Sequence, residues 1–175
     1  MAISVLLWAF RFAHILSGVA WVGGAFIWSM VVAPRLLARG PAPIRRPVLE
    51  ALIDAVPRYF LVSGGMTVLF GVLLLGQLHG WGSFFATLQK GTYGAMLGIG
   101  FILALVMLAL GAWVVTPTAK KLLGIMQSLP PGEPTAEAQA RLGVLGKRMA
   151  MAGMTTALLG TIALAAMTWA VTNGV

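Results

Sequence analysis

The 175-residue chain contains no cysteine, and only 9% of its residues are charged. The absence of cysteine excludes disulfide bonds, thiolate metal sites and covalent attachment of a c-type haem. A charged fraction far below the roughly 25% of ordinary soluble domains argues against a water-soluble fold and against a nucleic-acid partner. Because 59% of the residues are hydrophobic and the mean hydropathy is +0.94, the composition predicts an integral membrane protein in contact with the lipid bilayer.

Carboxylates are the scarcest charged groups in the chain. There are 4, and all of them lie between the long apolar stretches, at Glu50, Asp54, Glu133 and Glu137. We therefore expect no carboxylate proton relay and no paired-carboxylate catalysis within the bilayer. The sequence also has no glycine-rich phosphate loop followed by Lys-Ser/Thr and no zinc signature.

Four long apolar stretches account for most of the chain. They cover about residues 3–33, 58–79, 92–116 and 146–172, and each is long enough to cross a hydrocarbon core of ~30 Å as a helix. Their continuous Leu, Ala and Gly content is typical of helices rather than of the alternating strands of a membrane barrel. The sequence thus predicts a single all-α transmembrane domain over 1–175, a polytopic four-helix bundle with up-down-up-down topology.

The basic residues predict how the spans are oriented. Ten of the 12 lie within or beside two segments, at about 34–57 and 117–145. The positive-inside rule then predicts a multi-pass protein of the cell membrane, with both segments as cytoplasmic loops and both termini outside. Three tryptophans fall near the predicted outer interface, as in an aromatic belt: Trp8, Trp81 and Trp169.

The two predicted loops carry helical signals of their own. The segment from Pro47 to Pro57 has one apolar face, which predicts a short helix lying on the membrane. This face is formed by Val48, Leu49, Leu52, Ile53 and Val56. After the chain break predicted at Pro130-Pro131-Gly132, Thr135 has the character of an N-cap and Glu137 suits the positive end of a helix dipole. The fourth helix is therefore expected to begin near Thr135 and to project out of the bilayer.

Glycines recur in every span and predict close helix packing, because lipid tails compete equally for larger apolar side chains. Gly94 and Gly98 have small-xxx-small spacing, and Gly153 and Gly160 stand one heptad apart. We interpret these glycines as contacts within one bundle. Glycine-rich faces that contact a second copy or other membrane subunits, and space for a flat cofactor, are the alternatives left open.

Histidine is the remaining chemically versatile group, and the chain has only 2, His14 and His79. Because successive helices run in opposite directions, the start of the first span and the end of the second are predicted to reach the same outer leaflet. Arg11 precedes His14 by three residues, and Lys90 directly precedes the third span. The sequence therefore predicts an outer-leaflet cluster of these four side chains, and ionisable groups at membrane depth are functional candidates.

This cluster has the chemistry of a haem b site. Neutral imidazole binds haem iron, and Arg11 or Lys90 would pair with the propionates. We expect His14 as axial ligand and His79 as a candidate second ligand. On the helix, His14, Gly18, Trp21 and Ala25 share one stripe, where Gly18 would leave space for a porphyrin face. The alternative is that His14 only bonds a neighbouring helix and that His79 is an interfacial loop residue.

A copper site is the alternative cofactor prediction. The run Met149-Ala-Met-Ala-Gly-Met154 supplies soft thioethers, which suit Cu(I). Met149 and Met151 point about 200° apart on a helix, so only Met151 and Met154 can share a ligand face. The candidate metal ligands are therefore His14, His79, Met151 and Met154, and ordinary packing is the competing interpretation of the methionines.

The first span reads His14-Ile-Leu-Ser-Gly-Val-Ala-Trp21-Val-Gly23-Gly24 and is followed by Ala33-Pro34-Arg35-Leu36. It resembles the copper-resistance D (CopD-like) integral membrane proteins and, less closely, the HemJ-type protoporphyrinogen oxidases, which place Pro-Arg nearer to the tryptophan. Lys90 before the third span resembles their lysine-led helix. The resemblance covers about a quarter of the chain. It implies a small helical bundle that handles haem or metal, with His14 as ligand and Lys90 as partner, and it does not extend to His79.

Three functions follow as hypotheses. The first is haem b binding through His14 for electron transfer or porphyrin oxidation, which would make the protein a membrane oxidoreductase. The second is copper transport or delivery. The third is a non-catalytic subunit of a larger membrane complex, in which His14 is structural.

Overall fold

The computed structural model describes residues 2–32, 34, 42–129 and 135–173, and it confirms an all-α fold over these residues. The long helices are α1 (Ala2–Phe26), α3 (Ala42–His79), α5 (Gly91–Leu110), α6 (Thr116–Ser128) and α7 (Ala136–Asn173). The π-helical segment η1 (Ile27–Val32) extends α1, and a second one, η3 (Gly111–Val115), joins α5 to α6. The 3-10 turn η2 (Trp81–Ser83) and the short α4 (Phe84–Leu88) connect α3 to α5.

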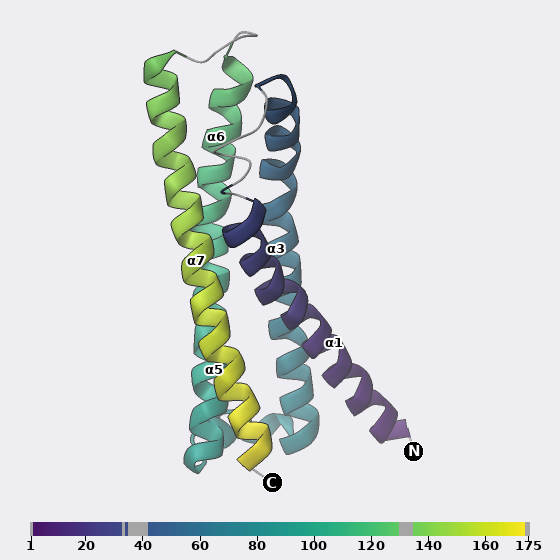
Figure 1. Ribbon diagram of the computed structural model, residues 1–175. Coiled ribbons are helices and arrows are strands. Elements are labelled where there is room, and N and C mark those ends of the chain that lie inside the picture. The colour runs from purple at the N-terminus through teal and green to yellow at the C-terminus, as the bar shows by residue number, and fades with distance from the viewer. Residues whose placement is uncertain (1, 33, 35–41, 130–134, 174–175) are drawn as a thin grey trace.

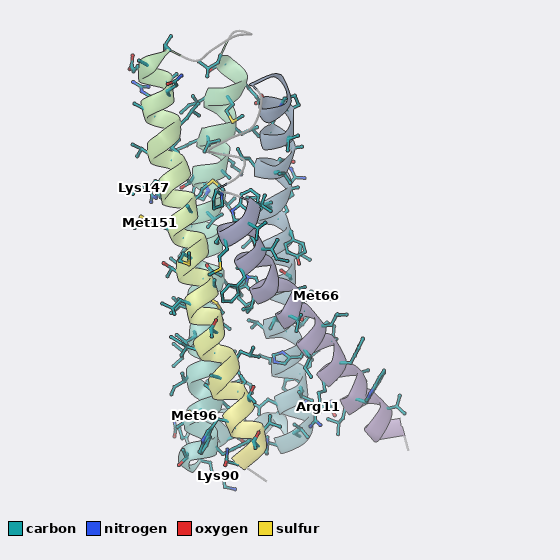
Figure 2. The ribbon with its side chains drawn as sticks, in the orientation of Figure 1. Arg11, Met66, Lys90, Met96, Lys147 and Met151 are labelled. Atoms are coloured by element: carbon teal, nitrogen blue, oxygen red, sulfur yellow. The ribbon has the colours of Figure 1, made fainter. Side chains whose placement is uncertain are left out.

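The long helices form an up-down-up-down bundle (Figure 1). α1 begins and α7 ends at one end of this bundle, called here the terminal end, whereas α6 ends and α7 begins at the other. Arg11 and Lys90 lie toward the terminal end, whereas Lys147 lies much closer to the other (Figure 2). Four helical segments are long and apolar enough to cross a membrane, as expected for a multi-pass membrane protein: Val5–Val32, Glu50–His79, Gly91–Ser128 and Ala136–Asn173.

The segments predicted as loops are largely helical. α3 begins at Ala42 and runs without a break into its span, and α7 begins at Ala136. Each of these helices has 38 residues and is therefore about 57 Å long, nearly twice the ~30 Å of a hydrocarbon core. The N-terminal parts of α3 and α7, together with α6, form a three-helix extension beyond the expected edge of the bilayer. We call this end of the bundle the basic end, because Lys120, Lys121, Lys147 and Arg148 lie on it.

The third span was predicted to end at about residue 116, but the helix continues through Pro117 into α6. Proline has no N–H to donate, and its ring crowds the carbonyl four residues earlier. Here the π turn of η3 comes immediately before it, and the Thr116 hydroxyl donates to the Gly111 carbonyl oxygen at 2.9 Å. The wider turn and this side-chain bond allow the helix to continue through Pro117 into α6.

The segment Pro47–Pro57 is not a separate helix on the membrane surface, which corrects the sequence-based prediction. It is part of α3, and Ile53 on its apolar face packs against α6 and α7. Ile53 is buried in a small core with Ala119, Leu122, Met126 and Met149. Protein therefore covers Ile53, because α6 and α7 extend alongside it, whereas Val48 of the same face is 37% exposed. Leu49 belongs to the predicted face, but its side chain lies outside the described residues, as do Arg35, Arg39 and 130–133.

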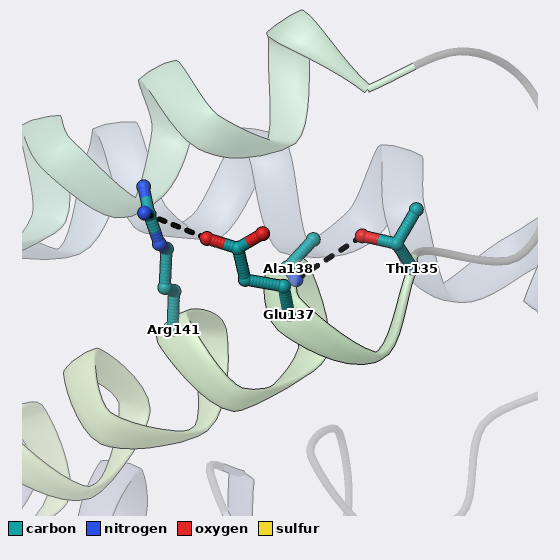
Figure 3. A network of polar contacts seen from close by, with 4 residues as sticks. All are labelled: Thr135, Glu137, Ala138 and Arg141. Atoms are coloured by element: carbon teal, nitrogen blue, oxygen red, sulfur yellow. Dashed lines mark hydrogen bonds and ion pairs between the residues drawn. The ribbon is translucent and has the colours of Figure 1, made fainter.

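The predicted start of α7 is confirmed. The Thr135 hydroxyl oxygen accepts a hydrogen bond from the Ala138 backbone N–H at 3.3 Å, as an N-cap does (Figure 3). In the same turn, Arg141 donates to the Glu137 carboxylate at 2.8 Å. Glu137 also lies in the first turn of α7, where its negative charge complements the helix dipole.

Glycines bring the helices together as the sequence predicted, with one unexpected partner. A Cβ atom at Gly64 of α3 would lie 2.6 Å from the Trp21 ring of α1, and one at Gly160 of α7 would lie 2.8 Å from Val22. Gly94, by contrast, packs against the backbone of Thr87 and Leu88. The small-xxx-small pair of α5 therefore accommodates the short α4 rather than another spanning helix.

Candidate functional site

His14 lies at the interface between α1 and α3, and its imidazole is hydrogen-bonded. The distance from its Nδ1 to the Thr67 carbonyl oxygen is 2.8 Å. A carbonyl only accepts, so Nδ1 carries the proton in this contact and Nε2 keeps its lone pair. The ring lies against Gly71, where an added Cβ would be 2.9 Å from His14 Cε1. The residue is half-buried.

The described residues give Nε2 of His14 no hydrogen-bond partner. A metal-bound histidine usually has this arrangement, because a backbone carbonyl on one ring nitrogen fixes the tautomer and leaves the other nitrogen for the metal. The same Nδ1 contact is also the interhelical bond expected if His14 were only structural. The free nitrogen is therefore the feature that distinguishes this histidine from a simple packing residue.

The depth of His14 differs from the position predicted with the outer-leaflet cluster. Its contacts on α3 are at Thr67 and Gly71, whereas the apolar part of that helix runs from about Tyr59 to His79. Thr67 lies about 12 Å along the helix from Tyr59, and Gly71 lies about 12 Å from His79. The imidazole therefore lies near the middle of the span.

His79 is not brought to His14. It is exposed at the end of α3, where its Nε2 lies 3.2 Å from the Tyr93 hydroxyl and the two rings pack edge to face with centroids 5.8 Å apart. Since Gly71 contacts His14, a rise of about 12 Å along α3 separates the levels of the two imidazoles. Both therefore cannot be axial ligands of one iron in this arrangement, and the predicted shared level is not observed.

Arg11 and Lys90 do not complete the predicted cluster either. Both side chains are exposed, Arg11 on α1 and Lys90 at the N-cap of α5. Figure 2 shows them on different sides of the bundle. Within the described part of the chain, neither is hydrogen-bonded to an imidazole. Helix direction determines which end of the bundle each residue lies nearer to, but it does not determine the position of the residue around the bundle axis. The predicted cluster of four side chains is therefore not formed.

The predicted stripe forms one face of α1, but other helices pack against this face and leave no space for a cofactor beside Gly18. A Cβ atom at Gly18 would lie in ordinary contact with Thr67 Cγ2, at 3.6 Å, so α3 fills the space predicted for a porphyrin face. Trp21 is 2% exposed and Ala25 is 1% exposed. Gly18 and Trp21 thus act in helix packing here, and Nε2 of His14 is a polar atom of this stripe that the described residues do not bond.

The methionine ligand set is not assembled. Met151 and Met154 do share a face of α7, but this face points outward, with the residues 62% and 47% exposed. Met149 is buried in the core of the three-helix extension. In the described ranges, no three His, Asp or Glu side chains come together in a way that could hold a metal ion.

A small cavity that no sequence pattern indicated lies between the spanning helices. Its volume is about 30 Å³, the space of roughly one water molecule, and Trp21, Trp28, Met107 and Met149 are among its lining residues. Nearby, Ser29 of η1 is buried and its hydroxyl has no partner among the described residues. Ser29 lies in a π-helical segment, and such segments frequently occur at functional sites. No sequence pattern comparable with a helix cap predicts them, so the buried hydroxyl was not predicted.

Comparison of the chain with models of known families, with curated proteins and with solved structures found no match. The resemblance to CopD-like and HemJ-type proteins therefore rests on the residues of the first span and on Lys90.

Proposed function

We propose that the protein is an integral membrane haem b-binding protein in which Nε2 of His14 is the axial ligand that this chain provides. One observation carries the proposal: an imidazole near the middle of the span is held by Thr67 in the ligand tautomer, and its second nitrogen has no partner. Within hydrocarbon, such an acceptor has no water to accept a hydrogen bond from. Coordination to iron would satisfy it, and the resemblance of the first span to CopD-like and HemJ-type proteins supports the same residue.

His14 suits haem iron as a ligand, but the space predicted beside Gly18 for the porphyrin is filled. His14 fits as a ligand, whereas the packing of Gly18 against Thr67 leaves no space for a porphyrin at that position. Bound haem b would supply one-electron chemistry, in electron transfer or porphyrin oxidation. In this proposal His14 holds the iron, the Thr67 carbonyl fixes the proton on Nδ1, and Gly71 leaves room for the ring. The chain supplies one imidazole, because His79 is bonded to Tyr93 at a different level.

The absorption spectrum of protein purified after expression with ample haem tests this proposal. We expect a Soret band in the wild type, its loss in His14→Ala, and an unchanged band in His79→Ala, the matched histidine control. A wild-type protein without the band, or His14→Ala with the same band, would refute haem binding through His14. Metal analysis of the same preparation addresses the copper alternative, since copper without haem would favour that function.

A second candidate is a non-catalytic subunit of a larger membrane complex, and the geometry of α1 favours it. The N-terminal half of α1 diverges from α7 (Figure 1) and exposes large apolar side chains such as Trp8, Phe12 and Ile15. In this alternative, the His14–Thr67 bond only fastens α1 to α3. Native electrophoresis after mild solubilisation distinguishes the candidates, because a single monodisperse monomer would contradict the subunit function.

A further inference from the structure

A groove lies on the outer side of the bundle, between α7 and the junction of α5 with η3. Leu110 and Val114 line it from one side, and Met151 and Thr155 line it from α7. Lys147 and Arg148 line it where α7 approaches the three-helix extension. Figure 2 shows Lys147 and Met151 close together on the outer side of α7. We call this feature the basic groove.

The two cations of the basic groove are exposed and have no ion pair with any described residue. Two of the described carboxylates are paired elsewhere: Asp54 with Arg58 and Glu137 with Arg141, each at 2.8 Å. Glu137 lies ten residues before Lys147 on α7, a distance of about 15 Å along the helix. The positive charge at this end of the groove is therefore available to a ligand from outside the chain.

The groove also lies at the depth where a phospholipid changes from polar to apolar. The continuously apolar part of α7 begins at Met149, directly after Lys147 and Arg148. The two cations thus belong at headgroup level, and Leu110, Val114 and Met151 lie at the level of acyl chains. Arginine and lysine at such a position attract anionic lipid headgroups, and basic pockets between spanning helices bind them.

We propose that the basic groove binds an anionic phospholipid, with its phosphate at Lys147 and Arg148 and one acyl chain along Leu110, Val114 and Met151. A zwitterionic lipid has the same chains but carries a compensating cation, so charge complementarity favours the anionic one. This site is separate from His14 and does not depend on haem binding.

Native mass spectrometry of the full chain in detergent tests the proposal, with phosphatidylglycerol and phosphatidylcholine of identical chains as probes. We expect the wild type to retain one phosphatidylglycerol in clear preference to phosphatidylcholine. The variant Lys147→Gln/Arg148→Gln should bind phosphatidylglycerol roughly 30-fold more weakly, if each cation near the surface contributes about 1 kcal/mol. The control variant Lys120→Gln/Lys121→Gln removes the same charge from α6 at the same end, and it should bind as the wild type does.

A second variant tests the acyl-chain part of the site. Met151 is mostly exposed, so Met151→Trp fills the groove without altering the charge or the core. We expect it to weaken phosphatidylglycerol binding while helicity by circular dichroism stays unchanged. No preference for phosphatidylglycerol in the wild type, or equal losses in the two double variants, would overturn the proposal. Full binding by Met151→Trp would overturn the assignment of the acyl chain to the groove.

Discussion

Substitution of Gly71 by alanine tests the contact that positions the His14 imidazole. The new Cβ would lie 2.9 Å from His14 Cε1 and 3.0 Å from Nδ1, closer than real Cβ contacts allow, so the ring has to move. Movement of the ring strains the 2.8 Å bond to the Thr67 carbonyl. Overpacking of this kind costs about 1–3 kcal/mol, and an interhelical side-chain hydrogen bond in a membrane protein contributes about 0.6 kcal/mol on average.

Gly65 provides the matched control on the same helix. A Cβ atom there would meet nothing within 4 Å, so Gly65→Ala changes the backbone propensity of α3 in the same way without a new contact. We therefore expect Gly71→Ala to unfold about 1–3 kcal/mol more easily than Gly65→Ala. The assay is equilibrium unfolding by SDS titration from mixed micelles, followed by circular dichroism.

The double variant His14→Ala/Gly71→Ala makes the reasoning falsifiable. Removal of the imidazole leaves space beside Gly71, and the alanine methyl group then partly fills that space. The free energy of unfolding of the double variant should accordingly exceed the value expected from adding the two single effects, with a coupling of about 1–3 kcal/mol. Additive effects, or equal stability of Gly71→Ala and Gly65→Ala, would show that the imidazole does not lie against Gly71.

Three further predictions concern stability, measured by the same SDS titration. Ser29→Ala should be neutral or should stabilise the protein by about 1 kcal/mol, because it removes a buried hydroxyl without a described partner. Ser63→Ala should destabilise the protein, because it removes a hydroxyl that donates to the Tyr59 backbone carbonyl at 2.7 Å. The reverse order of stability would mean that the Ser29 hydroxyl is satisfied. Ile53→Ala should cost about 2–5 kcal/mol and Val48→Ala much less, and equal effects would contradict packing of the three-helix extension. Thr135→Ala should cost about 1 kcal/mol by removing the N-cap of α7, and full stability would show that this end of the helix is frayed.

The sequence was sufficient for the spans because a membrane allows few alternatives. Backbone groups in hydrocarbon must bond internally, so a long apolar stretch has to be a helix. Four such stretches with short or polar connections then alternate in direction. The start of α7 was also predictable, because Thr135 and Glu137 give a cap signal that depends on local chemistry alone.

The extension was not predictable from single segments. Pro117 favours the end of a helix, but the π turn of η3 and the bond from Thr116 to Gly111 allow the helix to continue. The face containing Ile53 looks the same whether lipid headgroups or other helices cover it. Only the extension of α6 and α7 alongside α3 decides that protein covers Ile53.

At the candidate site, the sequence predicts the directions of the helices but not how far one helix is shifted along another. Helix direction places the N-terminal half of α1 and the C-terminal half of α3 in the same half of the bundle, but hydropathy does not set how far one helix is shifted along the other. That shift is set by contacts such as His14 with Thr67 and Gly71, which no local pattern encodes. A difference of eight residues along α3, between Gly71 and His79, is enough to separate two imidazoles by about 12 Å.

The corrected depth of His14 strengthens the case for a ligand at this residue rather than weakening it. Near the interface, water could satisfy the second ring nitrogen, and an unpaired imidazole would need no further explanation. Near the middle of the span water is scarce, so Nε2 either stays without a partner or binds an electrophile. The Thr67 carbonyl fixes the proton on Nδ1, which keeps Nε2 in the form that a metal requires. The loss of His79 as a partner therefore changes the proposed ligand count, while the argument for His14 depends only on its own depth and hydrogen bond.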